Sequence, residues 1–289
     1  MIDAIKSAEK SVDIIIFRFD LKPVERALEA AVKRGVVVRA LIAHTNSGGE
    51  KRLRQLEHRM LEAGVTVSRT ADDLVRYHGK MTIIDRRETH VYGFNYTALD
   101  LKSRSFGLVC RDRRCVQEGV SLFEADATKQ PYEPTLDSFV VSPENAREQL
   151  ATFIKRTKRQ LLIWDPKVSD PQMIRLLQQH VRAGLDIRVI GKVAKRGDGL
   201  RAKKFGGKRL HVRAMVRDGD TAFVGSQSLR ALELDGRREV GMITRDPKAV
   251  KRLLETFQAD WAKTELGLKE KREQRSQSEE PEYAMAASR

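Results

Sequence analysis

The chain alternates between short apolar runs and longer segments whose apolar residues recur at helical spacing. The first cycle predicts a strand over 11–17, a helix from Pro23 to Gly35 and a strand over 36–43. A charged helix and a short strand over 65–67 follow. Strands that alternate with helices in this way are typical of a parallel sheet covered by helices, so the sequence indicates an α/β fold.

Three further strands and a helix complete this first part of the chain, over 81–84, 90–94, 106–110 and 114–129. Pro131, Pro134 and Pro143 then interrupt the hydrophobic pattern, which predicts a linker over 131–143.

The same order of elements begins again after the linker. It predicts helices over 144–159, 169–183 and 247–263 and strands over 160–164, 185–190, 222–225 and 240–244. A loop rich in glycine and lysine replaces the charged helix of the first cycle. We therefore predict an internal duplication, with a first half over 1–130, a second half over 144–265 and a disordered charged tail over 266–289.

A repeated motif, His-x-cation-x4-Asp, supports the duplication. Its two copies are His78, Lys80 and Asp85 in the first half and His211, Arg213 and Asp218 in the second. The similarity continues downstream, because Asn95 and Ser228 each follow the histidine of their own half by 17 residues. A match of this length is stronger evidence for duplication than a single strand-helix-strand unit.

The alternation of side chains along a strand places each histidine on the same face as the cation two residues later. A cation there can stabilise negative charge developing at phosphorus, and neutral imidazole is a good phosphorus nucleophile. We expect the two copies to hold one phosphate, with one histidine attacking and the other protonating the leaving oxygen. Asp85 and Asp218 lie an odd number of positions from their histidines, so they are expected to point away and fix a turn or pair with a neighbour.

The histidines have two other interpretations. A single histidine at the start of a strand is more often a hydrogen-bonded polar residue than a nucleophile, but two matched copies favour a phosphate site. Zinc is a second alternative, since histidine is a common zinc ligand. Lys80 and Arg213 would repel a dication and no cysteine or carboxylate cluster completes a site, so we expect no metal.

The net charge of +15 and a pI near 9.9 favour contact with polyanions, although abundant surface lysine and arginine alone give the same balance. Cys110 and Cys115 form no disulfide or zinc framework, which favours a reducing compartment. The sequence shows no membrane-spanning run and no secretory signal. We expect a cytoplasmic protein, with peripheral contact at a membrane surface as the alternative.

These residues resemble the phospholipase D superfamily, whose signature is His-x-Lys-x4-Asp-x6-Gly-Ser-x-Asn, usually in two copies. The resemblance covers residues 1 to about 265. It implies a duplicated phospholipase D-like fold, with two α/β halves related by a pseudo-twofold axis and central mixed sheets. It also implies metal-independent chemistry through a covalent phosphohistidine, without a cofactor, as in phospholipases D, cardiolipin and phosphatidylserine synthases, and some nucleases.

Both copies depart from this signature. The first keeps Asn95 but carries Gly93 in the place of the serine, and the second keeps Ser226 but carries Arg213 and Ser228 in the places of lysine and asparagine. Arginine preserves the charge and can contact two phosphate oxygens, but it is bulkier than lysine. Asn95, Ser226 and Ser228 are expected to hydrogen-bond phosphate oxygens from the strand beside the histidine.

A further acid in this superfamily orients a histidine from a strand after the motif. Glu239 fits this role for His211, and the parallel place in the first half carries Ser105. Each half thus has a feature that the other lacks, and the chemistry depends on both. Because both halves lie in one chain, we expect a monomer.

The basic loop over 191–213 leads directly to His211 and is expected to recruit a polyanion, unless its charge serves only to keep an exposed loop soluble. Phe205 is its only aromatic residue, so it offers no stacking platform for bases. The sequence predicts a phosphodiester hydrolase or phosphatidyltransferase acting on phospholipid headgroups. A nuclease is the first alternative, and a catalytically weak polyanion-binding relative is the second.

Overall fold

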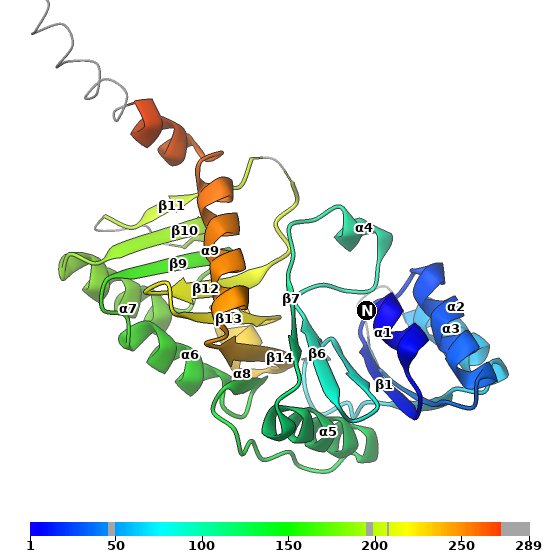
Figure 1. Ribbon diagram of the computed structural model, residues 1–289. Coiled ribbons are helices and arrows are strands. Elements are labelled where there is room, and N and C mark those ends of the chain that lie inside the picture. The colour runs from blue at the N-terminus through cyan, green and yellow to red at the C-terminus, as the bar shows by residue number, and fades with distance from the viewer. Residues whose placement is uncertain (46–49, 195–198, 207, 273–289) are drawn as a thin grey trace, which may run out of the picture.

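The computed structural model describes residues 1–45, 50–194, 199–206 and 208–272. Figure 1 shows two α/β halves side by side, the first at the right in blue to green and the second at the left in green to orange. Each half is built on its own mixed sheet, and the two sheets repeat the same strand order. The predicted duplicated α/β fold with mixed central sheets is confirmed.

The first sheet has the order β3-β2-β1-β5-β6-β7, in which β1, β2 and β3 are parallel and the remaining pairs are antiparallel. Its strands are β1 (Ser11–Ile16), β2 (Val37–Ile42), β3 (Thr66–Arg69), β5 (Met81–Ile84), β6 (Glu88–Tyr92) and β7 (Gly107–Cys110). The accompanying helices are α1 (Ile2–Ser7), α2 (Lys22–Lys33), α3 (Glu50–Glu62), α4 (Ala98–Leu101) and α5 (Arg113–Thr128).

The second sheet repeats this order as β11-β10-β9-β12-β13-β14. Its strands are β9 (Gln160–Val168), β10 (Asp186–Val193), β11 (Arg201–Lys203), β12 (Arg213–Arg217), β13 (Thr221–Gly225) and β14 (Arg237–Thr244). The helices are α6 (Ala146–Lys155), α7 (Pro171–Arg182), α8 (Ala231–Asp235) and α9 (Pro247–Trp261). Among the described residues no helix stands between β10 and β11, as predicted; residues 195–198 and 207 of the basic loop lie outside the described part.

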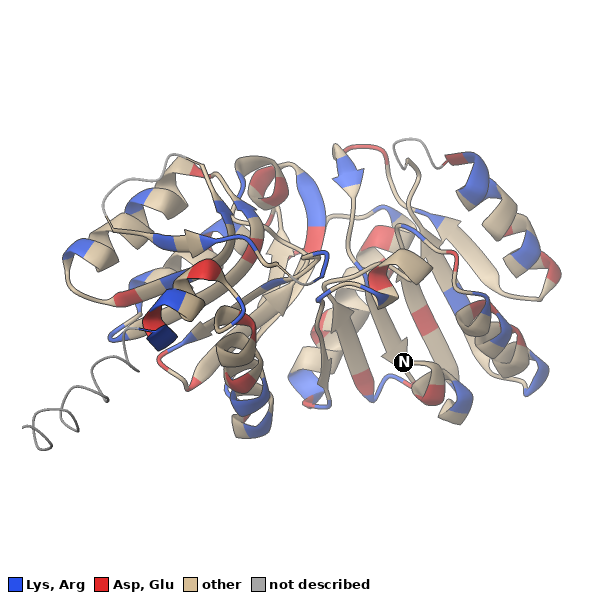
Figure 2. Ribbon diagram, turned by 90° about the horizontal axis from the view of Figure 1, so that it is seen from above, with Lys and Arg blue, Asp and Glu red and all other residues tan. Residues whose placement is uncertain are grey.

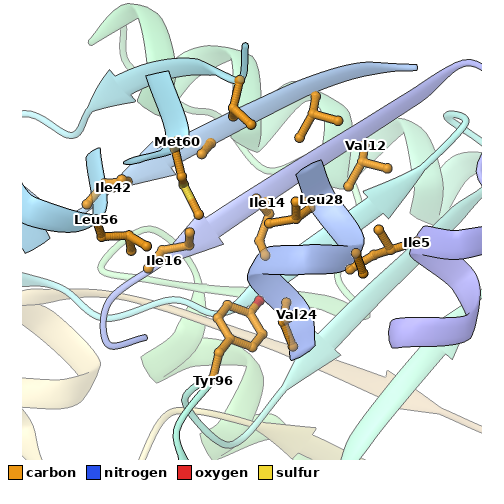
Figure 3. Close-up of a cluster of buried hydrophobic side chains, with 14 of the residues drawn as sticks. Ile5, Val12, Ile14, Ile16, Val24, Leu28, Ile42, Leu56, Met60 and Tyr96 are labelled. Carbon is orange, nitrogen blue, oxygen red and sulfur yellow. The ribbon is translucent and has the colours of Figure 1, made fainter. Parts of the chain in front are cut away.

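Alternating residues of β1 explain how the first sheet is covered on both faces. Ile14 and Ile16 point to the side of α2 and α3, where Figure 3 shows Leu28 and Met60 in the same cluster. Ile15 points to the opposite side and joins the cluster that includes residues of α5. Burying each such side chain contributes about 1.5–3 kcal/mol, so β1 is fixed firmly and the segment that follows it has a defined place beside the site.

The predicted linker over 131–143 is wrong at its C-terminal end. Phe139–Ser142 forms a strand, β8, that pairs antiparallel with β14. Phe139, Val140 and Val141 are fully buried, which gives this short apolar run a reason to join the sheet despite the proline that follows it.

The predicted tail over 266–289 is also wrong at its start. Residues 265–272 are helical, and Glu270 accepts a hydrogen bond from Trp261 Nε1 at 3.2 Å. Glu270 also forms an ion pair with Arg201. Residues 273–289 lie outside the described part. No helix in the described ranges is long and apolar enough to cross a bilayer.

Candidate active site

The two predicted histidines lie where the halves exchange backbone hydrogen bonds. The short strand β4 (Arg76–Tyr77) belongs to the first half but pairs with β14 of the second, and His78 N donates to Arg238 O at 2.7 Å. On the other side, His211 N donates to Arg104 O at 3.1 Å. Each histidine is therefore held by the backbone of the opposite half.

The carboxylate partners of the histidines also cross between the halves. Nδ1 of His78 lies 2.8 Å from Oε2 of Glu239, and Nδ1 of His211 lies 2.7 Å from Oδ1 of Asp100. The prediction that Glu239 orients His211 was wrong: Glu239 holds His78. The pairing is reversed because β4 runs beside β14, which brings the first histidine next to the acid of the second half.

Asp100, which the sequence analysis missed, is fixed from several sides. Its Oδ2 accepts hydrogen bonds of 2.9 Å from both the backbone N and the side-chain Nδ2 of Asn95, and Arg209 Nη1 lies 2.6 Å from its Oδ1. Asn95 thus serves the carboxylate in this structure, while its own Oδ1 is buried without a partner among the described residues. One sequence signal points to Asp100: it follows His78 by 22 residues, and Glu233 follows His211 by 22.

The two motif cations lie close to the first histidine. Lys80 is fully buried, and its Nζ is 2.8 Å from Nδ1 and 2.9 Å from Nε2 of His78. Arg213 donates from Nε to Ser228 Oγ at 3.2 Å. Arg213 Nη1 is buried and has no hydrogen-bond partner among the described residues, so it is a donor available to an anion. Lys80 and Arg213 both act electrostatically on His78 and on Glu239.

The environment of His78 favours its neutral form. Burial lowers its pKa well below the usual value, and the charges of Lys80 and Arg213 lower it further. Burial also lowers the pKa of Lys80, to about 7, against the opposing effect of Glu239. The pKa of Glu239 itself is raised by burial.

His211 has the more strongly anionic partner. Burial lowers the pKa of His211, but Asp100 opposes that effect by close contact and charge. Burial alone would raise the pKa of Asp100, yet contact with His211 and Arg209 holds it well below its usual range. His211 is therefore better placed than His78 to carry a proton.

The remaining predicted residues lie around this centre or support it from a distance. Ser226 is fully buried, and its Oγ accepts from Val240 N at 3.1 Å, beside Glu239. The hydroxyl of Ser228 accepts a hydrogen bond from Arg213 Nε, and the backbone N–H of Ser228 donates one to Glu233.

The two motif aspartates lie away from the histidines. Asp85 accepts hydrogen bonds from the backbone N atoms of Glu9, Lys10 and Ser11 at the start of β1. Asp218 does the same for Lys158, Arg159 and Gln160 at the start of β9. Each aspartate thus joins the end of its motif strand to the first strand of its sheet.

Gly93 departs from the family signature for a geometric reason. It lies where the two sheets meet, and a Cβ at this position would be 2.9 Å from the carbonyl oxygen of Gly225. A serine would therefore force the halves apart at the centre of the site.

A family of known proteins matches both halves of the chain. A family model described as "Cardiolipin synthase, PLD-like domain" matches residues 1–127 and 150–261. No curated protein sequence matches the chain.

Solved structures with a similar fold include polyphosphate kinase from Porphyromonas gingivalis, with a TM-score of 0.72 and 19% identity over 87% of this chain and 46% of that one. This chain thus spans about half the length of that kinase. Phosphatidylserine synthase from Haemophilus influenzae Rd KW20 has a TM-score of 0.67 and 11% identity over 91% of this chain and 84% of that one. At these identities the likeness is one of fold.

Proposed function

Because the chain belongs to the phospholipase D superfamily, within the family described as cardiolipin synthase, PLD-like domain, we propose that it cleaves phosphodiester bonds through a covalent phosphohistidine. The observation that carries the proposal is the crossed pairing of His78 with Glu239 and of His211 with Asp100, beside Lys80. Two oriented imidazoles and a buried cation are the groups that nucleophilic displacement at phosphorus requires.

His78 is the nucleophile in this proposal. Its Nδ1 faces Glu239, so Nε2 attacks once Lys80, which contacts Nε2 in the structure, turns to a substrate oxygen; burial and two neighbouring cations favour the neutral form of His78. Attack forms the Nε2–P bond as the bond from phosphorus to the leaving oxygen breaks. Lys80 and Arg213 bind the non-bridging oxygens, where negative charge develops.

His211 is the general acid and then the general base. Asp100 stabilises its imidazolium, which gives a proton to the leaving oxygen in the first step. In the second step neutral His211 takes a proton from water or an alcohol as that oxygen attacks phosphorus and the N–P bond breaks. Water gives hydrolysis, and an alcohol gives transfer.

We propose phospholipid headgroups as the substrates. The family description, cardiolipin synthase, supports a lipid phosphodiester, as does the shared fold with a phosphatidylserine synthase along most of both chains. Peripheral contact with an anionic membrane and action as a monomer belong to the same proposal.

A nuclease is the second candidate, favoured by the net charge of +15. Figure 2 shows lysine and arginine distributed over both halves, which suits a polyanion of either kind.

Trapping of the intermediate tests the chemistry. The protein is incubated with 32P-labelled phosphatidyl, DNA and RNA substrates and quenched in alkali, because phosphohistidine is stable to base and labile to acid. We expect the wild-type protein to become labelled and His78→Ala to abolish the label. His211→Ala should let the label accumulate when the leaving group needs no proton. If polyanions bind but no substrate yields label or turnover, the protein is a non-catalytic binding relative. The substrate that labels the enzyme decides between lipid and nucleic acid.

A further inference from the structure

A second group of cations, distinct from Lys80 and Arg213, lies beside the His78 side of the site. Arg76 stands two residues before His78, so the extended chain places both side chains on the same face. In the pairing of β4 with β14, Arg76 lies directly opposite Arg237. Like charges opposite each other on paired strands are destabilising unless something of opposite charge lies between them.

The ring of Phe17 connects these arginines with the catalytic centre. The Arg76 guanidinium lies 5.6 Å from the centre of this ring, Arg18 lies 5.5 Å from it and Lys80 Nζ also lies 5.5 Å from it. The ring packs edge-on against His78, with 4.5 Å between ring centres. The outer arginine cluster, Arg18, Arg76 and Arg237, therefore adjoins the same point as the proposed nucleophile.

Protein carboxylates do not neutralise Arg76. Its guanidinium makes no hydrogen bond or ion pair with any residue in the described ranges. Glu233 and Glu239 are the nearest acids by their electrostatic effect, but Glu233 already binds Arg230 and Ser228 N, and Glu239 holds His78. Arg237 Nη1 donates to Glu233 Oε1 at 3.3 Å and lies 3.9 Å from Glu239 Oε1, whereas Arg237 Nε is buried with no hydrogen-bond partner in the described part of the chain.

The other half provides an internal comparison. Arg209 stands two residues before His211, as Arg76 stands before His78. Arg209 lies 2.6 Å from the carboxylate of Asp100 and donates to Ser103 Oγ at 3.2 Å. The same position is thus neutralised in the second half and crowded by like charge in the first. Consistent with this crowding, burial and the charges of Arg237 and Arg18 lower the pKa of Arg76.

We propose that the outer arginine cluster is a second anion subsite, so that the substrate carries another anionic group, a phosphate or a carboxylate, next to the phosphodiester that is cleaved. This inference rests on the proposed function for its meaning, because the subsite adjoins the reacting phosphate. Lys80 and Arg213 hold the reacting phosphate, and Arg76 with Arg237 holds the second group. Partial burial beside Phe17 reduces the screening of Arg76 by water.

Calorimetric titration with inorganic phosphate and inorganic pyrophosphate tests the subsite without any turnover. We expect the wild-type protein to bind pyrophosphate about tenfold more tightly than phosphate, since the second group gains charge-assisted hydrogen bonds. Arg76→Gln should reduce that ratio to near one while leaving phosphate affinity little changed. Arg76→Lys, which keeps the charge, should retain part of the preference.

Arg87→Gln is the matched control, because Arg87 is an exposed arginine in the turn at the far end of β5. It removes the same charge and should leave the ratio unchanged. Equal effects of Arg76→Gln and Arg87→Gln, or a wild-type ratio near one, would overturn the subsite. A phosphohistidine without the pyrophosphate preference refutes only the subsite, and the preference without a phosphohistidine refutes only the proposed chemistry.

Discussion

The carboxylate of Glu239 in the second half holds the imidazole of His78 in the first, with 2.8 Å between Oε2 and Nδ1. Asp100 of the first half stands in the same relation to His211 of the second. Neither motif histidine therefore has its carboxylate partner in its own half. The site forms only when the two halves pack together, so the proposed chemistry requires residues of both.

Replacing Glu239 with glutamine is expected to lower kcat roughly 10- to 100-fold, in line with the loss of a group that orients a reactive side chain. Glutamine keeps the volume but can present its NH2 group to Nδ1 of His78, which disfavours the tautomer needed for attack through Nε2. Steady-state kinetics on the substrate that labels the enzyme would measure the change.

Imidazole 15N chemical shifts show which histidine each acid controls. Glu239→Gln should change the Nδ1 shift of His78 and leave that of His211 in place. The matched variant Asp100→Asn should lower the pKa of His211, because Asp100 raises it in the folded protein. A change at His211 in the Glu239 variant would contradict the crossed arrangement.

On a substrate whose leaving group needs no proton from His211, kcat/KM should fall on the alkaline side from about pH 7. Burial lowers the pKa of Lys80 to about 7, so its cationic form is present below that pH and lost as the pH rises through it. Neutral Lys80 no longer attracts a phosphate oxygen. Because kcat/KM reports the free enzyme, a pH–rate profile between pH 5 and about 9 measures this titration directly.

Lys80→Arg separates this effect from other titrations. Arginine stays protonated to above about pH 12, so the alkaline limb should disappear even though the larger side chain lowers the overall rate. An unchanged alkaline limb in this variant would assign the titration to another group. His78 should remain active well below pH 6.5, since its lowered pKa keeps it neutral there.

Much of this architecture can be predicted from the sequence because its signals are local. The motif spacing brings His78 and Lys80 together, although both lie between β4 and β5 and not within a strand, and the apolar runs mark β1 and β9. The repeated order of elements then implies that two such strands belong to equivalent halves. Spacing within a strand and periodicity within a helix depend only on neighbouring residues, so both can be recognised without knowledge of the tertiary fold.

The partners of the histidines could not be predicted in the same way. Asp100 sits on a four-residue helix and acts on a histidine 111 positions later, while Glu239 acts on one 161 positions earlier. No local pattern carries such distances. The Glu239 contact follows from the pairing of β4 with β14, and the Asp100 contact follows from the backbone pairing of Arg104 with Leu210. Arg76 and Arg237 are likewise brought together by the pairing of β4 with β14, although Arg76 is close to His78 in sequence.

We expect Arg213 to suit this site better than the lysine of the superfamily signature would. Its Nε donates to Ser228 and its buried Nη1 is available to a phosphate, a division that lysine cannot reproduce. We expect Arg213→Lys to raise KM about tenfold through the loss of charged hydrogen bonds. The double variant Arg213→Lys with Ser228→Asn restores the superfamily signature and should recover part of the loss. Equal or lower KM in the single variant would show that the arginine has no such adaptation.

The aspartates of the two motifs should affect stability and not chemistry. Asp85 accepts three backbone N–H groups at the start of β1, and Asp218 accepts three at the start of β9, at the ends of the motif strands away from the histidines. Removing either carboxylate takes away the acceptor of three backbone N–H groups at a partly exposed site. Asp85→Ala and Asp218→Ala should therefore each lower the free energy of unfolding by about 1–3 kcal/mol. Urea denaturation measures this loss.

The turnover of the folded variants separates this role from a catalytic one. Both aspartates support the first strand of the sheet in their own half and do not contact the histidines. At temperatures where the variants are folded, the site therefore keeps its transition-state contacts, and kcat should stay within about threefold of the wild-type value. Asn at either position keeps one acceptor oxygen and should lose less stability than alanine. A loss of kcat as large as that of Glu239→Gln, in a variant with unchanged stability, would instead place the aspartate in the chemical step.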